Sequence, residues 1–90
     1  MKKTADKHII LGVHVTDRLR RAAAVQKIFS DYGCYIKTRL GLHEISPDAC
    51  SPNGLVLLEI VGSEKIAREL QRKLAAIRGI EVQRMVFVHD

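Results

Sequence analysis

Residues 17–41 form the most strongly patterned stretch of the chain and predict a helix that folds back on a strand. Four apolar residues recur at spacings of three, four and three, which a period of about 3.6 residues gathers onto one helix face. They are Ala22, Val25, Phe29 and Tyr32. Gly33 then predicts a left-handed stop, and the β-branched and aromatic residues that follow favour a strand over residues 34–43.

The residues before this stretch predict an opening strand. Residues 8–15 alternate in the way that a half-buried strand requires. The face expected in the core carries Ile9, Leu11, Val13 and Val15. Thr16 or Asp17 can cap the helix through its side chain, and the polar residues 1–7 are expected to be frayed.

The second half of the chain predicts a loop, a strand, a helix and a last strand. Both prolines and several turn formers fall in residues 44–54, whereas residues 55–61 are nearly all apolar and suit a central strand. Ser63 can cap a helix that Gly79 terminates. The apolar stripe of this helix is Ile66, Ala67, Leu70, Leu74 and Ile77. Residues 80–89 alternate again and predict the final strand.

The resulting order β-α-β-β-α-β predicts an α+β, ferredoxin-like fold, in which two helices cover one face of a four-stranded antiparallel sheet. The length of 90 residues suits a single domain spanning 1–90. The uncovered face would carry Ile10, His14, Arg39, Leu57, Val61, Met85 and Phe87. Such an apolar face predicts packing against further copies, as a homodimer or tetramer. The alternative is that Arg39, Glu59 and His14 interrupt the apolar patch so much that it binds nothing.

Composition narrows the range of partners. The net charge of +5 permits an anionic partner. However, the four aromatic residues form no RNP-like strand, so direct nucleic-acid binding has little support. No apolar run approaches the roughly 20 residues that span a bilayer, and no hydrophobic segment follows the amino-terminal lysines. We therefore expect a cytoplasmic protein without a membrane segment.

Cysteines and histidines are the candidates for metal chemistry. Cys34 is expected to be a small buried thiol, and Cys50 an exposed one in the predicted loop. His14 and His43 could face the open side of the sheet near Cys50, a ligand set that suits Ni, Zn or Cu. Scattered strand histidines are more often surface or interface residues. No Ser-His-Asp order, Walker loop or GxGxxG occurs, which predicts a protein that is not an enzyme, and no particular cofactor is indicated.

Several short motifs carry a family resemblance over nearly the whole chain. They are the segment VHVTDRLRRAAAVQKIFSDYG, the segment SPNGLVLLEIVG, the R-L-G-L that ends the second strand and the R-G-I-E-V that opens the last. With them the chain resembles ACT-like regulatory domains, most closely the stand-alone regulators of iron-only hydrogenase systems. The resemblance implies a ferredoxin-like fold, assembly through sheets and a regulatory or ligand-sensing role, with a small molecule or another protein as partner.

The chain is also similar, more distantly, to the nickel-binding domain of the nickel-responsive repressor. That domain uses a His-x-His strand and a nearby cysteine, of which His43 and Cys50 are present here. A transition-metal regulatory domain that uses His14, His43 and Cys50 is therefore the alternative function.

A pocket is predicted between the turn at residues 16–19 and the strand end at residues 39–43, where a guanidinium could hold an anionic ligand. The candidate ligand-binding residues are Thr16, Asp17, Arg18, Arg39, Gly41 and His43.

Overall fold

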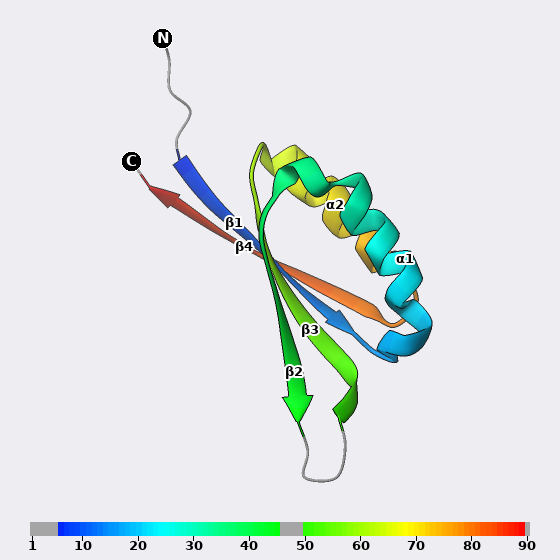
Figure 1. Cartoon of the computed structure of the whole chain (residues 1–90). Helices are drawn as coiled ribbons and strands as arrows, with labels where there is room; N and C mark the ends of the chain where they lie inside the picture. The colour runs from blue at the N-terminus through cyan, green and yellow to red at the C-terminus, as the bar shows by residue number, and fades with distance from the viewer. Residues whose placement is uncertain (1–5, 46–49, 90) are drawn as a thin grey trace.

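Four antiparallel strands form one sheet, and two helices lie against one of its faces (Figure 1). The computed structural model describes residues 6–45 and 50–89, without the side chains of residues 6, 18, 19, 43–45, 50–53 and 89. The elements in chain order are β1 (Asp6–Val15), α1 (Arg18–Asp31), the 3-10 helix η1 (Gly33–Tyr35), β2 (Ile36–Ile45), β3 (Cys50–Ile60), α2 (Glu64–Ala75) and β4 (Ile80–His89). The ferredoxin-like α+β fold is therefore confirmed.

The strand order in the sheet is β2-β3-β1-β4, so β1 and β3 are interior and β2 and β4 are edges. In the middle of β1, Leu11 is opposite Leu58 of β3 and Arg84 of β4. Its neighbour Gly12 is opposite Leu57 and Gln83. Successive rows of this register belong to opposite faces of the sheet. The prediction that residues 55–61 form an interior strand is confirmed for residues 55–60, since β3 ends at Ile60.

The core lies between the sheet and the helices. Its fully buried large side chains are Ile9, Leu11, Val13, Leu58, Leu70 and Leu74. They come from alternate strand positions and from the predicted stripe of α2, because these periodicities direct apolar side chains to one side of each element. The stripe of α1 is buried at Val25, Phe29 and Tyr32, but Ala22, the first residue of the stripe, is exposed.

The helix ends agree only partly with the prediction. Ser63 caps α2, since its Oγ accepts a hydrogen bond from the Ile66 N–H over 3.2 Å. Asp17 is the N-cap of α1, but it is left-handed with φ 58° and makes no side-chain cap hydrogen bond. Its carboxylate lies 3.4 Å from Arg20 Nε instead. The expected capping by this side chain is therefore wrong.

The segment after α1 differs from the expected glycine stop and strand. Within the described residues, the glycines with positive φ are Gly62 and Gly79, so Gly33 is no left-handed stop. The Tyr32 N–H still bonds to Ile28 O at 3.1 Å, and the helix ends where the chain then tightens into η1, with the Tyr35 N–H bonded to Tyr32 O at 2.9 Å. Cys34 lies in this surface turn and is exposed, so its predicted burial is wrong.

The strands β2 and β3 extend beyond the predicted strands on the sides where they are joined in the chain. β2 continues to Ile45 and β3 begins at Cys50, which pairs with Ile45, so Cys50 is a strand position and not part of a long loop. A bulge between Ile36 and Thr38 shifts the register of β2. Among the described helices, neither α1 nor α2 is long and apolar enough to cross a bilayer.

Candidate functional site

A groove of about 160 Å³ lies between α1 and the paired strands β2 and β3. Ala22, Val25 and Phe29 of α1 form its helical wall, and Val56 of β3 contributes an apolar strand side chain. Gln26 and Arg39 are its long polar side chains. A mostly apolar hollow with a few polar groups is the usual character of a small-molecule site.

Two glycines explain why the groove is open. Gly41 of β2 pairs with Val56 of β3. Gly54 lies two residues before Val56 on β3. A Cβ built on Gly41 would meet no atom within 4 Å, so the space above this strand position is empty. Ala22 of α1 therefore faces strand positions without large side chains, which is why it stays exposed.

Arg39 lies on the helix side of the sheet, whereas the sequence pattern predicted it on the uncovered face. It pairs with Leu58, whose side chain is buried in the core. The guanidinium stacks over Phe29 at 4.7 Å from the ring centroid, and its Nη1 donates to Gln26 Oε1 over 3.3 Å. These two contacts hold a cationic group with further N–H donors at the groove.

Of the six candidate ligand-binding residues, Arg39 and Gly41 line the groove together. Thr16 and Asp17 lie in the turn before α1, where the Thr16 N–H donates to Gly79 O over 2.9 Å, and they do not line it. Arg18 begins α1, but its side chain lies outside the described residues. The same holds for the side chain of His43, whose backbone pairs with Gly54.

The candidate metal ligands occupy different rows of the sheet. His14 pairs with Leu55 and Glu81, in a row of the open face, which is the sheet face without helices. The His43 position pairs with Gly54, which in turn pairs with the buried Val15 in the next row. Cys50 pairs with Ile45 nearer the hairpin end, and its side chain lies outside the described residues. The described side chains include no cluster of three potential metal ligands.

Sequence reasoning missed Gln26, Phe29 and Ala22 as groove residues. The signal was present, because these three residues are spaced by four and three positions and so share one helix face. Phe29 and Ala22 were interpreted only as core residues. Gln26 has no chemical signature of its own and becomes notable only through its hydrogen bond to Arg39.

Glu59 shows the clearest electrostatic effect on the open face. Its Oε2 lies 3.4 Å from His8 Nδ1, and its Oε1 accepts a hydrogen bond from Thr38 Oγ1 over 3.3 Å. The bond to His8 is the main cause that holds the pKa of Glu59 below its usual value of 4.5, and the charge of Lys37 contributes.

The lowered pKa of Glu59 predicts that the stability of the fold falls in acid. A carboxyl group whose pKa is lower in the folded chain stabilises the fold above its unfolded pKa, and this contribution is lost as pH falls through the folded pKa. The wild type should therefore lose stability below pH 4.5, and Glu59→Gln should lose less over the same interval. Melting temperatures from about pH 6 to about pH 3 measure the effect. Glu81→Gln, on the same face, is the control, and equal acid sensitivity of Glu59→Gln and wild type would contradict the prediction.

Comparison with known proteins gives structural neighbours of this fold. No protein-family model and no curated protein matches the sequence. The chain is similar to the structure of the uncharacterized protein TM1266 from Thermotoga maritima, with a TM-score of 0.75 and 20% identity over 91% of this chain and 99% of that one.

Two further neighbours are more distant. CPII, a nitrogen regulatory PII-like protein from Thiomonas intermedia K12 bound to ADP, AMP and bicarbonate, has a TM-score of 0.56 and 9% identity over 97% of this chain and 99% of that one. A dimeric ferredoxin-like protein from an uncultured marine organism has a TM-score of 0.56 and 8% identity, over 96% of each chain. At such identities these likenesses show the fold alone.

Proposed function

We propose that this chain is a non-enzymatic, ACT-like regulatory domain that senses a small anionic ligand and acts as a homo-oligomer. The groove of about 160 Å³ between α1 and the β2–β3 pair, with Arg39 beside an apolar wall, is the observation that carries this proposal. The nitrogen regulatory PII-like neighbour, bound to ADP, AMP and bicarbonate, is an example of this fold in a regulatory protein that binds small molecules.

The groove favours a ligand with an anionic group and a small apolar body. The guanidinium of Arg39 supplies a forked set of N–H donors that matches a carboxylate. Phe29 and Gln26 hold this guanidinium in place, so little side-chain freedom is lost on binding. The apolar body would lie over Gly41 and against Val25, where it replaces water next to apolar side chains.

Arg39→Gln tests the anionic contact. A panel of small carboxylates, with 3-methylbutanoate and benzoate among them, is titrated against the chain by calorimetry and by thermal shift. A hydrogen-bonded charge contributes roughly 1.5–3 kcal/mol, so we expect binding of the best carboxylate to weaken about 10- to 100-fold in Arg39→Gln. Arg84→Gln, which removes another strand guanidinium, one that bonds to Gln71 of α2, is the matched control and should bind like the wild type.

Gly41→Val tests the groove itself. The added side chain would enter empty space at a position whose φ is not left-handed, so the variant is expected to fold and to exclude the ligand. A carboxylate that binds Arg39→Gln and Gly41→Val as tightly as the wild type lies elsewhere. That result, or no binding by the whole panel, would remove the proposed site.

The proposal also covers assembly and pathway. Native mass spectrometry of the untagged chain reports the subunit number and any retained small mass, and a monomer would contradict the homo-oligomer. The resemblance to regulators of iron-only hydrogenase systems extends the proposal to that pathway. Deletion of the gene should change hydrogenase expression or activity in the host, and an unchanged hydrogenase would contradict this part alone.

A further inference from the structure

The open face of the sheet carries an extensive apolar surface. Both helices lie on the other side, so no element of the described chain covers it (Figure 1). Five large apolar side chains on this face are 41–54% exposed: Leu40, Leu42, Val61, Met85 and Phe87. A large exposed apolar patch is typical of an interaction surface.

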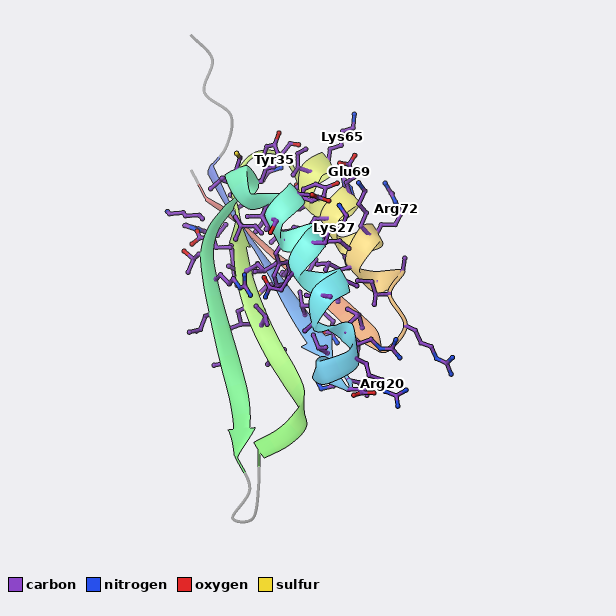
Figure 2. The ribbon with its side chains drawn as sticks, turned by 45° about the vertical axis from the view of Figure 1, so that its right-hand side comes forward. Arg20, Lys27, Tyr35, Lys65, Glu69 and Arg72 are labelled. Atoms are coloured by element: carbon purple, nitrogen blue, oxygen red, sulfur yellow. The ribbon has the colours of Figure 1, made fainter. Side chains whose placement is uncertain are left out.

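The lysines and arginines of the strands contact mainly the helix layer, on the side opposite the open face. On the strands, Arg39 stacks on α1, while Lys7 and Arg84 bond to side chains of α2 at 2.6 and 3.0 Å. Lys37, at the bulge of the edge strand β2, lines a hollow with Phe29 and Ser30 of α1, although its charge also acts on Glu59. Figure 2 shows further cations projecting from the helix layer: Arg20, Lys65 and Arg72. A polyanion would therefore meet its counter-charges on the helix side. Two copies of a chain with net charge +5 can bring their open faces together without opposing these lysines and arginines.

The acidic groups of the open face are bonded within the face. Glu59 contacts His8 and Thr38, and Glu81 accepts a hydrogen bond from Gln83 Nε2 over 3.0 Å. Neither carboxylate therefore needs a cation from a partner. This pattern suits a neutral, self-complementary partner better than a charged one.

A hollow at the centre of the open face would let another molecule approach the sheet closely. Gly12 lies mid-strand on β1 with no left-handed φ, so the backbone does not require glycine there. A Cβ on Gly12 would meet only Leu57 Cδ2, at 3.8 Å. Hollows of about 310 and 230 Å³ adjoin at this residue, and Met85 and Leu57 line the second. Glycine inside a strand weakens it and often marks close approach by another molecule.

The size of the face fits a dimer interface. An interface of standard size removes about 800 Å² from each partner, about an eighth of the 6374 Å² that this chain exposes. Four strands of 10 or 11 residues, at about 4.8 Å spacing and about 3.3 Å per residue, make a face of roughly 600 Å² in plan, and side-chain relief adds accessible area. A single edge strand would supply far less.

We infer that two copies of this chain pack open face to open face about a two-fold axis that passes between Gly12 and Met85, so that Met85 of each copy meets the hollow at Gly12 of the other. Each copy presents protruding side chains and a hollow to receive them: Met85 lines the hollow, and Leu40 is paired with Leu57, which also lines it. A two-fold interface requires such complementarity, because one patch contacts itself. This inference specifies the homo-oligomer of the proposed function, and it is independent of the ligand, whose groove lies on the helix side.

Met85→Glu and Gly12→Leu test the interface in the full-length chain by sedimentation equilibrium. The wild type is expected to be dimeric at about 50 µM. Met85→Glu adds two facing charges to the buried patch, and Gly12→Leu fills the hollow, so each should raise the dissociation constant about 100-fold. Val88→Glu is the matched control, because Val88 is 62% exposed on the same strand but in a row of the helix side, and it should remain dimeric.

Each outcome decides the question. Folded monomers of both variants beside a dimeric control support the interface, as would a tetramer that falls to a dimer. An oligomer that is indifferent to both variants would use a strand edge or the helix side, which overturns this interface but leaves the homo-oligomer. A monomeric wild type overturns both. If Met85→Glu fails to fold by circular dichroism, Gly12→Leu decides alone, because its side chain enters open space.

Discussion

Replacing Leu70 with alanine will lower the free energy of unfolding by about 3 kcal/mol. Leu70 lies on the buried face of α2 and is 0% exposed. The substitution removes the transfer free energy of the lost methyl and methylene groups and leaves a cavity that the rigid sheet cannot fill. The total free energy of unfolding of a small domain is only about 5–15 kcal/mol, so we expect a large fall in the midpoint of urea unfolding.

Val88→Ala is the control for this prediction. It also shortens an apolar side chain, but Val88 is largely exposed on β4. The free energy of unfolding should therefore change by less than about 0.5 kcal/mol. Protein concentration is held constant, because the stability of an oligomer depends on it. A loss below about 1 kcal/mol in Leu70→Ala would mean that α2 is not packed on the sheet as described.

Gly79→Ala is expected to cost about 2 kcal/mol of folding free energy. Gly79 has φ +86°, a conformation that side chains disfavour, and the new Cβ would lie 3.3 Å from Thr16 O and 3.4 Å from Arg21 Nε. The same turn accepts the Thr16 N–H hydrogen bond that joins the start of α1 to the start of β4. Arg21 Nε is already buried without a hydrogen-bond partner in the described chain, which leaves little freedom to adjust.

Gly33→Ala provides the matched comparison, measured by the same urea unfolding. Gly33 has no left-handed φ, and a Cβ there would meet no atom within 4 Å. Alanine reduces the freedom of the unfolded chain, so this variant should be neutral or more stable by up to about 1 kcal/mol. Equal losses in the two variants would refute the role of the left-handed turn at Gly79.

Most of the fold could be predicted from local pattern. Alternation in residues 8–15 identified the buried face of β1, and the stripe from Ile66 to Leu74 identified the buried face of α2. Ser63 was recognisable as a cap because the helix pattern begins directly after it. Such signals are local, since each depends on residues a few positions apart.

The face of β2 could not be predicted in the same way. Alternation divides Arg39 and Gly41 from Leu40 and Leu42, but it does not say which set faces the helices. Hydrophobicity favours the leucines as the buried set, and the structure has the leucines on the open face and Arg39 over Phe29. The pairing of β2 with β3, including the bulge after Ile36, decides this, and pairing is a property of two strands together.

The candidate site was predicted in part. Arg39 and Gly41 were expected in the pocket and line the groove, whereas Thr16 bonds to the turn before β4 and the Asp17 carboxylate lies beside Arg20. The groove depends on α1 crossing strand positions that lack side chains, and neither element alone contains that information. The hypothesis of a metal site at His14, His43 and Cys50 stays a prediction.

The sequence by itself determined the element order, the two helix stripes, the charge and the strand glycines, because each is set by neighbours along the chain. Only the tertiary structure decided that Gly41 lies beneath α1 while Gly12 lies at the centre of the open face. The physical reason is that an empty strand position becomes a groove or a docking hollow only through what packs beside it. Strand register and helix crossing, which join residues far apart in the chain, fix those neighbours.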